Sequence, residues 1–143
     1  MFYQIFYSLP VTATASNSRY LLIGNTHALS GTWAPVPPSG TLGYTPTNSR
    51  CNIGYSVTIG GATTRIIGTD GAQGESWGNA IFAPSPFLYL NRQAIYTSTA
   101  SVGTTLTFNF LVAHYDPATM HYNWPYPSPY NHKSTFTIME ISA

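Results

Sequence analysis

The segment Gly74-Glu75-Ser76-Trp77-Gly78 has the G-x-S-x-G spacing of a nucleophile elbow. In that motif a strand enters the turn and a helix leaves it, so that the serine is exposed at a strained position. The residues that follow, 79–86, are β-like and then broken by Pro84 and Pro86, which excludes an elbow helix. We therefore interpret the match as part of a Gly/Ser-rich loop and expect no catalytic serine at Ser76.

The carboxylates are equally poor candidates for catalysis. There are four of them, Asp70, Glu75, Asp116 and Glu140. Glycoside hydrolysis needs two carboxyl groups across the scissile bond, but Asp70 and Glu75 share one loop and nothing in the sequence indicates a cleft. Asp116 precedes a proline and is typical of a turn, and we expect Glu140 in the last strand to pair with an arginine. The sequence predicts that this protein is not an enzyme.

Histidine and cysteine could supply metal ligands or a nucleophile. The four histidines are His27, His114, His121 and His132. His114 with Asp116 offers nitrogen and oxygen ligands, but the spacing matches no compact zinc pattern. We interpret these histidines as hydrogen-bonded or interface residues, with a shared site at a trimer axis as the alternative. Cys51 begins an apolar strand face, so we expect a small buried residue. No metal and no cofactor is predicted.

The chain carries very little charge, which bears on its class of function. Only 6% of its 143 residues are charged, against about 25% in an ordinary soluble domain. No apolar run approaches the roughly 18 residues of a membrane span, and a net charge of +1 argues against a nucleic-acid binder. A free monomer normally keeps a charged surface. The composition therefore indicates a subunit of an assembly, or else a secreted carbohydrate-binding domain.

Period-two alternation predicts β structure along one domain, residues 1–143. In the segment Cys51 to Ile59 the apolar residues Ile53, Tyr55 and Val57 alternate with Asn52, Ser56 and Thr58. Gly60-Gly61 favours a two-residue hairpin turn, so residues 62–67 should return as the antiparallel neighbour. We expect the apolar set to be buried on one face.

Further strands are expected at 19–23, 79–82, 87–90, 94–97, 105–115 and 135–141, and an N-terminal strand should place Tyr3, Ile5, Tyr7 and Leu9 on one face. No apolar series has helical spacing over two turns, and Thr, Tyr, Phe and Ile favour strands. The predicted fold is all-β, a jelly roll or antiparallel β-sandwich of about eight short strands with long Pro/Gly-rich loops.

Three long loops are expected, at 32–46, 69–78 and 116–133. The third alternates prolines with aromatic residues, and loops of this length in a small domain are usually functional. Its rings could contact a neighbouring subunit, stack on a sugar, or fold back over their own sheet. We place the partner interface here, on Tyr122, Trp124, Tyr126 and Tyr130.

The chain as a whole resembles small bacteriophage structural proteins. The resemblance rests on a strand directly after Met1, a Thr/Ser/Gly-rich β body and the closing strand at 134–143. It is similar to jelly-roll capsid decoration (cement) proteins and, second, to the trimeric tips of tail fibres. The resemblance implies a virion structural protein that binds the major capsid protein, or another virion protein, at the capsid surface.

This resemblance also implies a homo-oligomer, a dimer or a trimer. The alternative function is an extracellular receptor- or carbohydrate-binding module that recognises a glycan. Neither nucleic acid nor membrane is expected as a partner.

Overall fold

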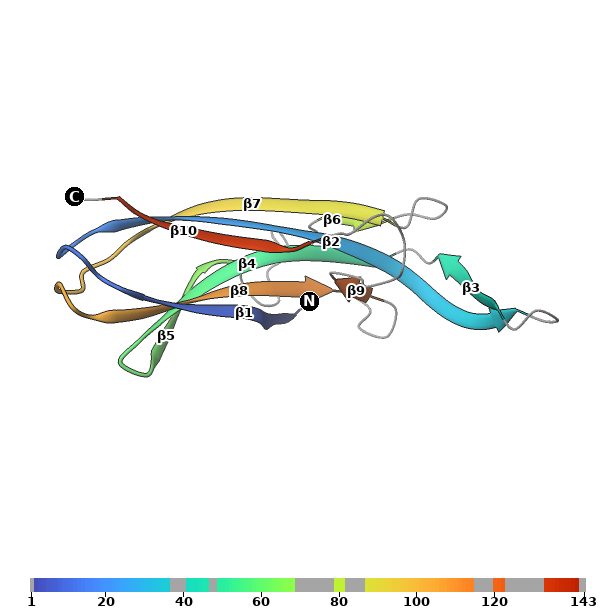
Figure 1. Cartoon of the computed structure of the whole chain (residues 1–143), viewed down its shortest axis with the longest axis horizontal. Helices are drawn as coiled ribbons and strands as arrows, with labels where there is room; N and C mark the ends of the chain where they lie inside the picture. The colour runs from blue at the N-terminus through green and yellow to red at the C-terminus, as the bar shows by residue number, and fades with distance from the viewer. Residues whose placement is uncertain are drawn as a thin grey trace.

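The described residues form two layers of antiparallel strands, shown in the computed structural model of Figure 1. The structure describes residues 2–36, 41–46, 49–68, 79–81, 87–114, 120–122 and 133–141. Their strands are β1 (Phe2–Thr12), β2 (Arg19–Val36), β3 (Thr41–Pro46), β4 (Ser49–Ile59), β5 (Ala62–Ile67), β6 (Asn79–Ile81), β7 (Phe87–Thr97), β8 (Thr105–His114), β9 (Met120–Tyr122) and β10 (Thr135–Ile141). The predicted all-β antiparallel sandwich is confirmed. No helix in these ranges is long and apolar enough to cross a membrane.

The two sheets are built from strands that are distant in the sequence. One sheet has the order β1-β8-β4-β5, with β6 paired to the start of β4. The other is centred on β2, which pairs with β10 along residues 19–25 and with β7 along residues 19–29. Further along, β2 pairs with β9 at residues 28–30 and with β3 at residues 31–36. Along the described strands the chain changes sheets five times, between β1 and β2, β3 and β4, β6 and β7, β7 and β8, and β8 and β9. Each sheet therefore depends on contacts that only the folded chain can make.

The β4–β5 hairpin lies where the sequence predicts it. β4 and β5 pair antiparallel, and Gly60 and Gly61 have φ angles of 56° and 84°. Positive φ at both turn positions matches the right-handed twist of the strands, which is why glycine suits them. Ile53, Tyr55 and Val57 are buried together, as expected.

The opposite face of β4, with the polar residues of the alternation, is also covered. Asn52 is only 7% exposed and Ser56 only 3%. The Asn109 side chain on β8 donates to Ser56 Oγ at 3.1 Å, and a Cβ on Gly54 would lie 2.8 Å from Cε1 of Tyr3. Both faces of β4 are therefore covered in its middle, and the polar residues there are buried with hydrogen-bond partners.

Several strands are longer or less regular than predicted. The segments expected at 87–90 and 94–97 are one strand, β7, and the strand expected at 19–23 extends to Val36. The long loop expected at 32–46 is wrong where it is described, because residues 32–36 belong to β2 and residues 41–46 form β3, and the two pair with each other. In β1 the register shifts between Ile5 and Tyr7. This bulge breaks the expected alternation, because Phe6 packs against the core while Ile5 is 64% exposed.

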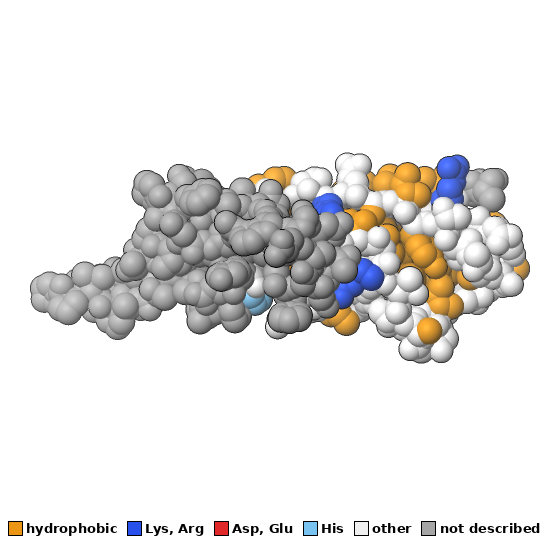
Figure 2. Space-filling view, turned by 180° about the vertical axis from the view of Figure 1, so that it is seen from behind, with side chains coloured by type: hydrophobic (Ala, Val, Ile, Leu, Met, Phe, Trp, Pro, Cys, Tyr) orange, Lys and Arg blue, Asp and Glu red, His pale blue; other side chains and the backbone are white. Residues whose placement is uncertain are grey.

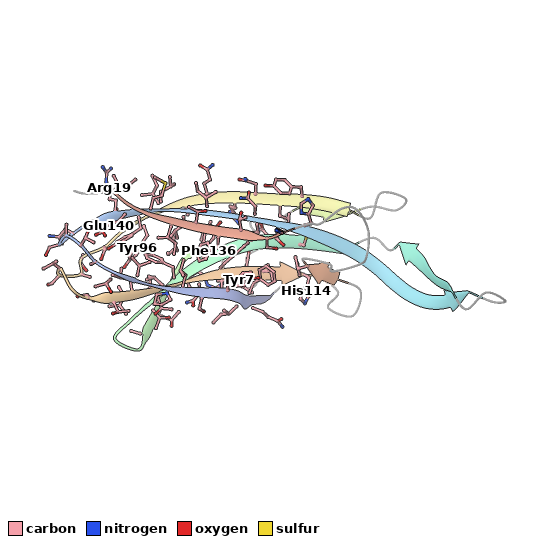
Figure 3. The ribbon with its side chains drawn as sticks, in the orientation of Figure 1. Tyr7, Arg19, Tyr96, His114, Phe136 and Glu140 are labelled. Atoms are coloured by element: carbon pink, nitrogen blue, oxygen red, sulfur yellow. The ribbon has the colours of Figure 1, made fainter. Side chains whose placement is uncertain are left out.

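Aromatic rings from both sheets fill the space between the layers. The ring of Phe110 on β8 lies 5.8 Å from Tyr55, 5.4 Å from Phe136 and 5.5 Å from Phe6. Nearer the turns that join β1 to β2 and β7 to β8, Phe108 contacts Tyr20 and Tyr96. Figure 3 shows Tyr96 and Phe136 between the two layers. Rings at these separations attract one another beyond the effect of burial alone, so this cluster joins the two sheets.

One end of the sandwich is closed by two of the segments that cross between the sheets. The β1–β2 turn (residues 13–18) and the β7–β8 turn (residues 98–104) exchange backbone hydrogen bonds. Ala13 N donates to Thr104 O and Gly103 N to Ala13 O, both at 2.9 Å. Ser98 N also donates to Ser18 O at 2.9 Å. These bonds satisfy turn amides that a sheet ladder cannot reach.

The ring cluster yields a test of the fold. Phe110→Ala should lower the free energy of unfolding by about 3–5 kcal/mol, because a buried ring is lost and a cavity is left. Thermal and denaturant unfolding measure this change. Val102→Ala is the control, since Val102 is exposed in the β7–β8 turn and its truncation should change stability by less than about 0.5 kcal/mol. Equal effects of the two substitutions would contradict the packing described here.

Candidate interaction surfaces

Most of the residues considered for catalysis lie outside the described part of the chain. These are Ser76 with its loop, Asp70, Glu75, Asp116 and His132. Cys51 is described and is fully buried, and burial raises the pKa of its thiol to about 12. A thiol with such a pKa stays protonated at neutral pH and is a poor nucleophile. The prediction of a small buried cysteine is confirmed.

The described histidines lie on three strands, β2, β8 and β9. His27 is on the outer side of β2, where its ring centroid is 4.9 Å from that of Tyr89. His114 ends β8 in the other sheet, and its ring lies 6.1 Å from that of Tyr122. His121 is the register partner of Leu29 in β9. Among the described residues, no group of three or more His, Cys, Asp or Glu side chains could hold a metal ion.

Glu140, which we expected to pair with an arginine, accepts hydrogen bonds from the β1–β2 turn. Its carboxylate accepts from Thr14 Oγ1 at 2.7 Å, from Thr14 N at 3.0 and 3.1 Å and from Ala15 N at 3.3 Å. Tyr20 Oη donates to it at 3.1 Å. Hydrogen bonds from Thr14 and Ser18 to the charged form lower the pKa of Glu140 from 4.5 to about 2. Glu140 therefore fastens β10 to the closed end (Figure 3).

Tyr122, one of the four residues expected at a partner interface, contacts its own chain. Its hydroxyl donates to the carbonyl of Ala113 at 2.9 Å, and its ring lies 6.0 Å from Phe6. Burial raises the pKa of Tyr122 well above its usual value. Tyr122 thus joins β9 to β1 and β8, and for this one residue the contacts match the alternative of a ring that folds back on its own chain. Trp124, Tyr126 and Tyr130 lie outside the described residues.

The outer face of the β10-β2-β7 sheet presents side chains in cross-strand rows. Register places Ile95, Leu21 and Met139 side by side, then Gln93, Ile23 and Thr137, then Asn91, Asn25 and Thr135, and last Tyr89 beside His27. Ile95 is 60% exposed, Met139 52% and Tyr89 54%. The amide row is hydrogen-bonded, since Asn91 Nδ2 donates to Asn25 Oδ1 and Asn25 Nδ2 to Thr135 Oγ1. We call this surface the outer β2 face.

The sequence did not reveal the outer β2 face. In β2, β7 and β10 the odd-numbered residues alternate with more buried even-numbered ones. This alternation is present in each strand by itself. The polar run Asn91-Arg92-Gln93, however, divides β7 into two expected strands. Arg92 lies on the inner side and donates to the carbonyl of Ile53 at 2.8 Å, so the strand continues through this run.

A second exposed surface is the free edge of β1. In the strand order of its sheet β1 is terminal and pairs only with β8 among the described strands. Ile5, Tyr7 and Leu9 are exposed there, and the strand contains no charged residue. Native edge strands are protected by charge, by proline or by a bulge. β1 has Pro10 and the bulge after Ile5 but no charge, so charge repulsion does not keep a partner from this edge.

The third surface is a two-stranded ribbon at the open end. Residues 31–36 of β2 pair with β3 and with no other described strand, and Figure 1 shows this ribbon extending beyond the rest of the sandwich. Register pairs Trp33 with Tyr44 and Pro35 with Leu42. The residues of both strands are all uncharged.

Charge is sparse over the described surface. Among the side chains whose exposure the structure describes, the exposed charged ones are Arg19, Arg65 and Lys133. Figure 2 shows a few isolated basic groups among apolar and neutral polar side chains, and no acidic group on the described part of that face. These separated cations do not form a basic patch that could follow a nucleic-acid backbone.

Comparison of the chain with protein-family models, with curated proteins and with solved structures finds no match. The proposed function therefore rests on the surfaces described above.

The Glu140 contacts predict a dependence of stability on pH. The folded-state pKa lies below the unfolded value, so the stabilisation is complete above about pH 4.5 and is lost as the pH falls toward 2. Glu140→Gln should therefore melt at a lower temperature than the parent at pH 6–8, and this difference should shrink below pH 4.5. Thermal unfolding across the pH range tests it. A difference that does not change with pH would exclude the charged form as the stabilising species.

The position of Tyr122 predicts that its ring stabilises the subunit. Tyr122→Ala should lower the free energy of unfolding by about 2–4 kcal/mol through loss of packing, and Tyr122→Phe by about 1 kcal/mol through loss of one hydrogen bond. Tyr89→Ala provides a matched exposed tyrosine, for which the loss should be below about 0.5 kcal/mol. If Tyr122→Ala melts at the same temperature as the parent, the ring does not stabilise the subunit, and Tyr122 would again be a candidate interface residue.

Proposed function

We propose that this protein is a structural subunit of a virus particle, a capsid decoration protein that binds the capsid surface and bridges neighbouring capsomers. The observation that carries the proposal is the projecting ribbon of residues 31–36 and 41–46. An isolated two-stranded hairpin is at best marginally stable in water, so this ribbon gains stability when it lies against a partner.

The ribbon has the composition that such a contact requires. Its strands combine apolar and Thr residues without charge, and the cores of interfaces are depleted in charge and enriched in aromatic residues. The sparse charge of the described surface and the uncharged β1 edge support the same reading. The partner would be the major capsid protein or another virion protein, and the location the virion surface.

Stabilisation would follow from mass action. A subunit that binds only assembled capsomers lowers the free energy of the assembled state by an amount set by its affinity and concentration. No reactive group is needed for this role. The buried, protonated Cys51 and the hydrogen-bonded Glu140 are consistent with a protein whose described titratable groups hold the fold together.

A second candidate function is binding of a glycan receptor. The exposed Tyr89 ring lies beside His27 and one row from the amides of Asn25 and Asn91. Sugars are commonly bound by such a combination of an aromatic face with neutral hydrogen-bonding groups. Glycan-array binding that is lost in Tyr89→Ala would favour this function.

We expect substitutions in the ribbon to weaken binding to virions without lowering the stability of the subunit. The double variant Trp33→Ala/Tyr44→Ala should lower retention on virions from the source of the sequence by at least about 30-fold, which is about 2 kcal/mol for an aromatic anchor. Its melting temperature should stay within about 2 °C of the parent, because residues 31–36 and β3 pair only with each other within the described chain. Co-sedimentation and thermal unfolding measure the two effects.

Two further variants complete this experiment. Tyr89→Ala, which truncates a ring on a different surface, should leave retention unchanged. Trp124→Ala tests the ring-rich segment, for which we also expect a greater loss of retention than of stability. Full retention of both the ribbon variant and Trp124→Ala would contradict the decoration function.

A further inference from the structure

An exposed cation lies at the same end of the outer β2 face as Tyr89. Ser134 Oγ lies 2.8 Å from the Oγ1 atom of the buried Thr26, so the chain already runs beside β2 before β10 begins, and Ser134 faces inward. Lys133 is the preceding residue and is exposed. Because successive side chains of an extended chain point to opposite faces, continuation of the β10–β2 register places Lys133 on the outer side, at the level of His27.

The neighbouring row supplies neutral hydrogen-bonding groups. Asn91 donates to Asn25, and Asn25 donates to Thr135. A side-chain amide has two N–H donors and a carbonyl acceptor, so these bonds leave one N–H of each amide, Asn91 Oδ1 and the Thr135 hydroxyl proton for a ligand. The row of Tyr89 and His27 is two residues away, about 7 Å along the strands. An exposed ring and directed polar groups therefore lie side by side.

The charge of the face indicates which ligand fits it. Lys133 and Arg19 are the exposed charged side chains that the structure describes on this face, and both are cations. Glu140 of β10 accepts hydrogen bonds from the β1–β2 turn at the far end, so it does not neutralise Lys133. A second copy of the same face would bring like charges together, whereas an anionic ligand is complementary to them.

We propose that the Tyr89 end of the outer β2 face binds a sugar that carries a carboxylate, the chemistry of a uronic acid. The sugar ring stacks on Tyr89, its hydroxyl groups bond to the row of Asn25 and Asn91, and its carboxylate pairs with Lys133. Neighbouring strands are about 4.8 Å apart, so the backbones at Lys133 and Tyr89 are about 10 Å apart across β2. The long, flexible lysine side chain spans this gap above His27.

This inference rests on the second candidate function, glycan binding, and names the class of glycan. It uses side chains that the ribbon of residues 31–36 and 41–46 does not contain. Binding of the sugar and retention on virions are therefore measured separately, and the result of one does not decide the other.

Carboxyl reduction supplies the matched probe, because it converts each carboxylate into a neutral hydroxymethyl group and keeps the sugar ring. The full chain is tested against hexuronate and sialylated oligosaccharides and their carboxyl-reduced forms, with affinities measured by titration calorimetry. The parent should bind an acidic form about fivefold more tightly than its reduced form, as expected for one exposed ion pair. Lys133→Gln should bind both forms equally, and Lys133→Arg should restore the preference.

Arg19→Gln is the control for charge. Arg19 is an exposed cation on the same face, but it is eight residues from His27 along β2, about 27 Å. This variant should keep the preference for the acidic form. Tyr89→Ala should weaken the binding of both forms by at least about tenfold, because it removes the aromatic anchor. All of these side chains are exposed, so the melting temperatures should match that of the parent.

The possible failures are distinguishable. Equal affinity of the parent for the acidic and reduced forms would overturn the inference and leave glycan binding intact. A preference that survives Lys133→Gln but is lost in Arg19→Gln would also overturn it, because the carboxylate would then lie at the other end of the face. If the parent binds no member of the set, both the inference and the glycan-binding function are contradicted.

Discussion

The packing of aromatic rings between two sheets is the interaction on which the rest of this structure depends. Phe108 and Phe110 on β8 contact rings that come from β1, β2, β4, β7 and β10. The tyrosines among them bring hydroxyl groups that need partners when buried. Tyr55 Oη donates to the carbonyl of Arg92 at 2.6 Å, and Tyr20 Oη donates to Glu140. The ring cluster thus also fixes polar contacts between the sheets.

The two ends of the sandwich differ, and this asymmetry relates the fold to the proposed function. At one end the crossing turns exchange hydrogen bonds and Glu140 fastens the last strand to them. At the other end β2 continues past its neighbours and extends into the ribbon with β3. Hydrogen bonds at the closed end hold the long strands in place, and one of these strands, β2, extends into the projecting ribbon. A rigid body with an uncharged extension suits a subunit that contacts neighbours, and it needs no catalytic group.

Local patterns predicted the elements, whereas contacts distant in the sequence decided their roles. The β4–β5 hairpin followed from alternation and Gly60-Gly61, and the apolar face of β4 was correct. The burial of Ser56 could not be predicted, because it depends on Asn109 in another strand. The partner of Glu140 is Thr14, at the opposite end of the chain. The outer β2 face likewise exists only in the register of three strands, so no single segment reveals it.

The central claim is that this charge-poor sandwich works as a subunit of a particle. Electron cryo-microscopy of virions from the source of the sequence tests that claim most directly. The account predicts density for an elongated two-layer sandwich on the capsid surface, with its ribbon end, residues 31–46, directed at a neighbouring protein. Particles that lack such density, together with recovery of the whole protein as a free species, would contradict it.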